Sequence, residues 1–206
     1  MKVLVSAVSI AVALAITGTA QAQNTDSKLV VKVGIANVVP KSDNGTLLGG
    51  ALNTDIGSSA RPSITLEYMV TPNIGVELLG AWPFRNEIKL NGVEHASVDV
   101  LPPTLSVQYH FLPDKAVSPF VGVGLNYAFI YNEKEKASIA GAKLEIDDSW
   151  GVAAHFGVDI NFNKNWVATI DGRWINMDSD VKLNGIDIGK AHIDPWVWGA
   201  SIGYRF

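Results

Sequence analysis

The chain has 206 residues, a formal net charge of -4 and no Cys. Hydrophobic residues make up 48% of the sequence and charged residues only 17%, which excludes a disordered chain. The lack of Cys excludes a disulfide scaffold and a thiolate metal site, and the acidic balance argues against nucleic-acid binding. This length suits a single domain.

The first 22 residues have the pattern of an export signal. Met1-Lys2 is a short basic segment, residues 3–16 are apolar or small, and Ala20-Gln21-Ala22 matches an A-x-A cleavage site. The apolar run is shorter than the roughly 20 residues that a spanning helix needs, so a retained membrane helix is the weaker alternative. We therefore expect residues 1–22 to be a signal peptide, cleaved after Ala22, and residues 23–206 to form one mature domain.

The mature sequence repeats one pattern of alternating apolar residues, each repeat ending in residues typical of turns. The last segment shows it most clearly, because one face carries Trp196, Trp198, Ala200, Ile202, Tyr204 and Phe206. Seven earlier segments alternate in the same way and begin near Leu29, Ile64, Ile74, Leu101, Val121, Trp150 and Trp166. Since hydrocarbon tolerates no unpaired strand edge, strands that cross a membrane must close into a barrel. We predict an all-β fold, an eight-stranded antiparallel transmembrane β-barrel.

The connections between these segments alternate in length. Short turns are expected at 71–73, 113–118 and 163–165, and long polar loops at 41–61, 85–97, 132–147 and 178–191. Short turns on one side and long loops on the other are typical of outer-membrane barrels with both termini in the periplasm. Aromatic residues cluster near the strand ends, where rings favour the headgroup level of a bilayer. The sequence thus predicts a protein of the bacterial outer membrane, surrounded by outer-membrane lipid.

The inward positions carry charges of both signs, with Lys32, Arg173 and Arg205 against Glu67, Glu77, Asp159 and Asp171. Eight strands leave an interior just wide enough for side chains, and buried charges are costly unless they pair. We interpret these residues as a polar plug that holds the barrel together, in preference to a continuous ion-conducting pore. The plug would consist of Lys32, Glu67, Glu77, His110, Asp159, Asp171 and Arg205.

Toward the outside the inward positions become apolar. They include Val38, Ala81, Ala128, Ile130, Ala153, Ile175, Met177 and Val197. This change fits either an apolar pocket open to the outside or simple packing beneath the loops, and the sequence does not choose between them.

The outer strand ends also carry Pro40, Pro62, Pro83, Pro102, Pro103 and Pro195. Each removes a ladder donor, which would either open a lateral exit into lipid or merely end a strand.

Several motifs together resemble the outer-membrane protein W family. The most specific is Leu101-Pro102-Pro103-Thr104-Leu105, followed by Gln108-Tyr109-His110-Phe111. Further matches in order are residues 68–69, 73–79, 83–85, 119–127, 148–151, 157–159, 194–197 and 203–206. The resemblance implies an eight-stranded barrel that gives small hydrophobic molecules passive entry through a narrow apolar channel.

Within this resemblance, Leu79 matches an inward apolar constriction position. Arg173 stands where a large apolar residue is expected, and an Arg there would favour a blocked or more polar passage. The lining expected for the channel is Leu79, Ala81, Ile130, Arg173, Ile175 and Met177. The terminal Phe206 resembles the tag that the barrel-assembly machinery reads, while the last strand also seals the barrel.

Two functions remain open at this stage. The first is uptake of small hydrophobic molecules, with lateral exit into the membrane. The alternative is a structural or surface-interaction barrel whose external loops act as a receptor or adhesin. An enzyme is not expected, because the four His residues are scattered, no G-x-S-x-G motif occurs and a His95–Ser97 pair would lack an orienting third group. No cofactor and no metal are expected, since no His cluster has zinc-ligand spacing.

Overall fold

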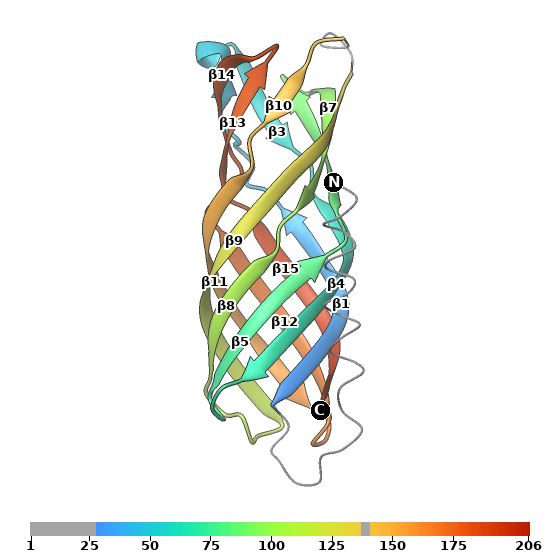
Figure 1. The fold of residues 1–206 in the computed structure, drawn as a ribbon, viewed down its shortest axis with the longest axis vertical. Helices are drawn as coiled ribbons and strands as arrows, with labels where there is room; N and C mark the ends of the chain where they lie inside the picture. Colours follow the sequence, from blue (N-terminus) through green and yellow to red (C-terminus); the bar gives the residue numbers. More distant parts are fainter. Residues whose placement is uncertain (1–27, 137–140) are drawn as a thin grey trace.

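The computed structural model describes residues 28–136 and 141–206, and most of them lie in strands. Eight strands form the barrel: β1 (Leu29–Val39), β4 (Ser59–Met69), β5 (Ile74–Ala81), β8 (Thr104–His110), β9 (Val117–Glu135), β11 (Ser149–Asn161), β12 (Trp166–Ile175) and β15 (Trp196–Arg205). Each pairs antiparallel with the next in this order, and β15 pairs with β1, so the sheet closes on itself (Figure 1). The predicted fold class is confirmed.

The expected signal peptide lies outside the described residues. Within the part of the chain that the structure describes, no helix is both long enough and apolar enough to cross a membrane.

The strands expose apolar side chains and bury polar ones. In β8 the side chains of Thr104, Ser106 and Gln108 are buried, whereas those of Leu105 and Val107 are about half exposed. A soluble protein would show the reverse. Alternating apolar residues on the outside and polar residues on the inside is the arrangement that lipid around a barrel requires.

Aromatic side chains gather at both ends of the barrel wall. At the end that holds the C-terminus, the Trp166 ring packs edge-on against Tyr204, 5.2 Å between centroids. At the opposite end the Trp196 and Trp198 rings stack 5.6 Å apart, and Trp150 packs 4.5 Å from Tyr127. These two groups are positioned for the two headgroup layers of a bilayer.

The segments expected to be long polar loops are largely strands, so that expectation was wrong. Beyond the membrane the wall continues in β2 (Thr46–Leu47), β3 (Leu52–Ile56), β6 (Phe84–Leu90), β7 (Val93–Leu101), β10 (Leu144–Ile146), β13 (Asp178–Leu183) and β14 (Ile186–His192), with a short 3-10 turn at Leu48–Gly50. These strands extend the barrel at the end opposite the C-terminus (Figure 1).

Two of these extensions are hairpins with Asn-Gly turns. Asn91-Gly92 joins β6 to β7 and Asn184-Gly185 joins β13 to β14, with φ of 50°, 80°, 52° and 78° in that order. Positive φ at both central residues is what a type I′ turn needs, and its twist matches that of the flanking strands. The hairpins bury apolar residues such as Ile88 and Val181, which form a core inside the outer part of the barrel.

Candidate functional site

A cluster of buried charged side chains fills the middle of the lumen. Its members, here called the charged cluster, are Lys32, Glu67, Glu77, His110, His155, Asp159, Asp171 and Arg173. Lys32 Nζ lies 3.0 Å from Glu67 Oε2, 3.4 Å from Asp159 Oδ1 and 3.9 Å from Glu77 Oε2. All four side chains are at most 3% exposed, so their charges are compensated within the barrel.

Glu77 joins this part of the cluster to a second cation. Arg173 Nη2 donates to Glu77 Oε1 at 2.7 Å and lies 3.3 Å from Asp171 Oδ2. His155 Nε2 lies 3.1 Å from the same Asp171 oxygen, and its Nδ1 lies 3.1 Å from the amide nitrogen of Gln108. The cluster is therefore one connected network rather than a set of separate pairs.

His110 completes the network on the side of Lys32. Its Nε2 lies 2.8 Å from Glu67 Oε1 and its Nδ1 3.5 Å from Asp159 Oδ2. Glu67, His110 and Asp159 place three ligand atoms close enough together to reach one metal ion. Lys32 Nζ already lies against both carboxylates, however, and supplies the positive charge that they need. The geometry thus fits an ion-pair network better than a metal centre.

Glycines of β15 make room for the charged cluster. A Cβ at Gly203 would lie 2.7 Å from Lys32 Cγ, and a Cβ at Gly199 would lie 2.3 Å from Asp171 Oδ1. Both distances are shorter than side-chain contacts allow. β15 therefore contributes space, while six other barrel strands contribute the charged side chains.

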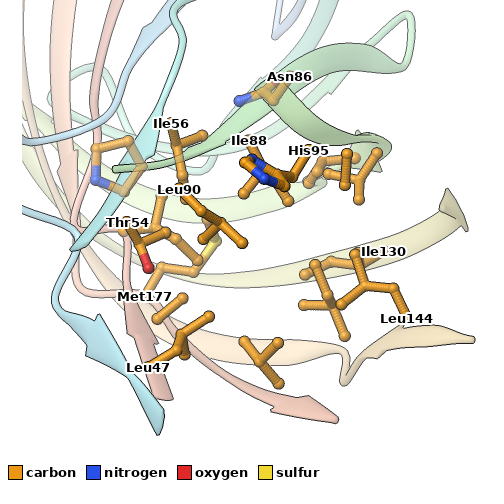
Figure 2. Close-up of a pocket in the computed structure, with 18 of the residues that line it drawn as sticks. Leu47, Thr54, Ile56, Asn86, Ile88, Leu90, His95, Ile130, Leu144 and Met177 are labelled. Carbon is orange, nitrogen blue, oxygen red and sulfur yellow. The ribbon is translucent and has the colours of Figure 1, made fainter. Parts of the chain in front are cut away.

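An apolar pocket with a cavity of about 100 Å³ lies in the outer part of the lumen (Figure 2). Its walls come from the outer hairpins and from the upper ends of β1, β12 and β15. All but three of the lining residues are apolar, the exceptions being Thr54, Asn86 and His95. An apolar cavity of roughly 150 Å³ in another protein stays dry and binds benzene, so this space suits a small apolar molecule.

The structure separates the residues expected to line one channel. Ile130, Ile175 and Met177 line the pocket, and Ala81 packs against the core around it. Leu79 lies lower, beside Arg173 at a second small cavity. Arg173 itself belongs to the charged cluster and does not line the apolar pocket.

The expected plug residues come together with one exception. Arg205 lies apart from the cluster, with its Nη2 donating to Asn161 Oδ1 at 2.7 Å. His155 belongs to the cluster although it was not among the expected plug residues, and its inward position in the strand alternation was the signal for it. Ile88 and Leu90 of the pocket were missed because residues 85–97 were interpreted as a loop.

The barrel wall is interrupted where prolines face one another. Leu79 pairs with Thr104 on one side of the interruption, and Phe84 pairs with Val100 on the other. Between these pairs residues 80–83 and 101–103, all of them described, form no ladder pairs with each other. We call this interruption the proline gap, because it contains Pro83, Pro102 and Pro103, which have no N–H to donate.

The pocket reaches the proline gap. Phe84 and Val100 border the gap, Pro102 lies within it, and all three line the pocket. Neighbouring strands hold the edges of the gap: Trp82 N donates to Pro62 O at 2.9 Å, and Asn126 Nδ2 donates to Pro102 O at 3.2 Å. The gap is therefore a defined feature of the wall with pocket residues at its border.

Comparisons with known proteins identify the family to which this barrel belongs. A family model described as the OmpW family matches residues 25–206. Outer membrane protein W of Salmonella typhimurium is 34% identical, with 96% of this chain and 97% of that protein covered. The crystal structure of OprG from Pseudomonas aeruginosa has a TM-score of 0.77 at 26% identity and covers 89% of this chain and 97% of that one. The dibenzothiophene metabolism operon protein PahQ of Pseudomonas aeruginosa is 28% identical over 88% of this chain and 90% of its own. The chain thus belongs to the OmpW family and is a protein of the bacterial outer membrane.

Proposed function

We propose that this barrel takes up small hydrophobic molecules from outside and releases them sideways into the outer membrane. The observation that carries the proposal is the apolar pocket whose lining borders the proline gap at Phe84, Val100 and Pro102. A molecule would enter from the external end, rest in the pocket and leave through the gap. Its path would be apolar throughout, so each step avoids the cost of exposing apolar surface to water.

The charged cluster supports a lateral route over a straight one. An apolar molecule moving down the lumen would have to pass Arg173, Glu77 and Lys32, which bridge the lumen through buried ion pairs. Separating buried charges without replacing their partners is strongly unfavourable. Exit into lipid at the proline gap needs no such separation.

The relatives favour an apolar cargo. PahQ is named for an operon of dibenzothiophene metabolism, and dibenzothiophene is an uncharged aromatic compound. The name of this similar protein therefore supports an apolar molecule as the cargo of the apolar pocket in this chain.

The proposed role is passive transport without catalysis. His95, the candidate base that the sequence places near Ser97, has its Nδ1 2.6 Å from the backbone oxygen of Val93. The His95 ring lines the pocket, whereas Ser97 is not among the lining residues, and no hydrogen bond joins the two side chains in the described part of the chain. A search for ester hydrolysis by the purified barrel should find no turnover above background, and turnover lost on Ser97→Ala would contradict this part of the proposal.

We also propose that Phe206 serves the barrel-assembly machinery. Phe206 is about half exposed on the outside of the wall, and its N–H donates to Leu29 O at 2.9 Å. Its ring is therefore accessible while its backbone seals β15 against β1. Deleting Phe206 should lower the amount of heat-modifiable, assembled barrel in outer membranes, and an unchanged amount would count against the tag.

A filled pocket tests uptake. Ala96 is buried and lines the pocket, so Ala96→Phe would occupy the cavity with a ring. Cells producing this variant should take up a small hydrocarbon such as ethylbenzene at the rate of cells that lack the barrel. Ala154→Phe is the matched control, because Ala154 is exposed on the lipid face and its ring would leave the pocket open. Equal uptake by the two variants would overturn the proposal.

A reversible staple across the proline gap tests the exit. The natural chain has no Cys, so Gly80→Cys and Pro103→Cys would be the only thiols that a short, cleavable bifunctional reagent could join. Stapled barrels should lose ethylbenzene uptake and regain it when the reagent is cleaved. The same pair of substitutions without the reagent is the control. Full uptake in the stapled form would place the exit elsewhere.

A further inference from the structure

Two buried polar atoms in the apolar pocket have no hydrogen-bond partner. Thr54 of β3 and Asn86 of β6 are 6% and 5% exposed, and both line the pocket. Neither Thr54 Oγ1 nor Asn86 Oδ1 has a partner among the described residues. Figure 2 shows both side chains among the apolar ones that surround the cavity.

Such atoms are uncommon in folded proteins because burial removes their bonds to water. An unpaired buried donor or acceptor destabilises the fold by its full desolvation penalty, and each instance in a native protein needs an explanation. Val has the shape of Thr, and Leu is close in size to Asn, so an apolar pocket could have been built without either group. Their place in the lining points to a polar group on the molecule that the pocket holds.

His95 offers a third polar atom. Its Nδ1 lies 2.6 Å from Val93 O, and a carbonyl oxygen can only accept a hydrogen bond. Nδ1 therefore carries the ring proton, which leaves Nε2 as an acceptor on a ring that lines the pocket. The pocket thus combines acceptors with one hydroxyl and one amide, and none of its lining residues is acidic, Lys or Arg.

The polar groups lie at two levels of the pocket. Thr54 pairs in register with Leu90, near the tip of the β6–β7 hairpin, and Asn86 lies four residues nearer the membrane on β6. At roughly 3.3 Å per residue the two levels are about 13 Å apart along the strand. A molecule travelling inward would meet Thr54 first and Asn86 afterwards.

We propose that the pocket selects neutral hydrophobic molecules that carry a hydroxyl group, such as alkyl phenols and medium-chain alcohols. A hydroxyl both donates and accepts, so it can pair with Thr54 Oγ1 at the outer level or with the Asn86 amide, in either orientation, at the inner level. A pure hydrocarbon leaves these atoms unpaired. A carboxylate would lose its hydration without meeting a Lys or Arg side chain in the lining. This specificity rests on the proposed uptake function and names its substrate class.

Two probes that differ only by a hydroxyl test the proposal. The barrel is reconstituted in lipid nanodiscs with ¹³C-methyl methionine and titrated with 4-ethylphenol or ethylbenzene. The Met177 methyl group reports on the pocket that it lines, and Met69 of β4, which is not a lining residue, is the internal control. The wild-type barrel should bind 4-ethylphenol at least about fivefold more tightly than ethylbenzene, the factor that one net hydrogen bond gives.

Three variants assign the preference to these side chains. At least one of Thr54→Val and Asn86→Leu should reduce the preference by about fivefold, according to the level at which the hydroxyl rests, while ethylbenzene binding stays equal or improves. Thr54→Ser keeps a hydroxyl and should keep the preference. Thr54→Val and Asn86→Leu should also resist unfolding by urea better than the wild-type barrel, because each removes an unpaired buried polar group.

The outcomes separate the two proposals. Equal binding of both probes to the wild-type pocket overturns the hydroxyl preference and leaves hydrophobic uptake standing. If neither probe shifts the Met177 signal, the pocket does not bind such molecules and both proposals fail. A preference that survives in Thr54→Val and Asn86→Leu alike places the hydroxyl-binding group elsewhere and overturns the assignment.

Discussion

Lys32 is the residue on which the charge balance of the lumen depends. Its ammonium group lies within 3.9 Å of three carboxylates and 5.8 Å from the centroid of the Phe120 ring. The charged cluster contains four carboxylates and only one other permanent cation, Arg173. Removal of Lys32 would therefore leave buried negative charge that no neighbour can neutralise.

Lys32→Met should destabilise the barrel by about 3–5 kcal/mol, the usual cost of breaking a buried ion pair by removing one partner. The measurement is the free energy of unfolding in urea, followed by tryptophan fluorescence in lipid vesicles. Lys190→Met is the control, since Lys190 pairs with Asp180 while both side chains remain nearly half exposed, and it should change stability little. Similar effects of the two substitutions would show that the charged cluster does not stabilise the barrel.

The partners of Arg173 illustrate what a sequence can and cannot predict at this scale. Strand alternation predicted that Arg173 and Glu77 face inward, and both do. It could not predict that they meet, because they lie on β12 and β5, 96 positions apart, and their contact depends on the tilt and stagger of the closed barrel. Arg173 was interpreted both as one of the inward charges that should pair and as channel lining, and its guanidinium is bound in the charged cluster.

At the scale of elements, the β6–β7 hairpin is held to β9 by a side-chain network. Asp99 accepts hydrogen bonds from Arg85 Nε at 3.0 Å and from Asn132 Nδ2 at 2.6 Å. Burial opposes the ionisation of Asp99, but these hydrogen bonds and the Arg85 charge outweigh burial and hold its pKa below the usual range. The network therefore ties three strands of the external wall together while Asp99 is ionised.

This network predicts a pH dependence confined to the hairpin. The pKa of Asp99 is lower in the folded protein than the ordinary value of about 3.9. Its contribution to stability is thus complete above that value and is lost as the pH falls through the folded pKa. Amide hydrogen exchange of residues 84–101 should accelerate at acidic pH, and Asp99→Asn should remove most of this change. A hairpin whose exchange is insensitive to pH, after correction for intrinsic rates, would contradict the prediction.

The eight barrel strands were predictable because apolar residues alternate with other residues along each of them. The outer hairpins were missed although their turns carry a signal: Asn91-Gly92 and Asn184-Gly185 are the dipeptides that type I′ turns favour. Polar residues such as Glu87 and Lys89 led to an interpretation as loops, because only the alternate positions, Ile88 and Leu90, face the pocket. The pocket could not be predicted in full without these strands.

At the scale of the whole molecule, polar and apolar layers divide the lumen along its length. The pocket lies in the outer part, and the charged cluster lies between it and the periplasmic end. Members of the cluster come from six of the eight barrel strands, and seven of the eight are at most 3% exposed. This arrangement separates the passage of apolar molecules from the passage of ions.

In planar bilayers the purified barrel should therefore show no stable ion conductance at neutral pH, while reconstituted barrels still bind ethylbenzene. Ions would have to cross the charged cluster, in which the carboxylates already bind Lys32 and Arg173. The measurement is single-channel current in symmetrical potassium chloride. Lys32→Ala combined with Arg173→Ala should raise the conductance, and steady current through the wild-type barrel would show that the cluster leaves an open pore.

The glycines of β15 also bear on how the cylinder is sealed. β15 closes the barrel against β1, and at the level of the charged cluster it presents Gly199 and Gly203 to the interior. The other strands can consequently establish their electrostatic contacts while the seam with β1 is still open. The terminal segment can then slide into register along β1 without forcing a bulky or ionised group past the lysine and carboxylates already in place. At the level of the charged cluster, the barrel thus closes through backbone hydrogen bonds between β15 and β1 alone.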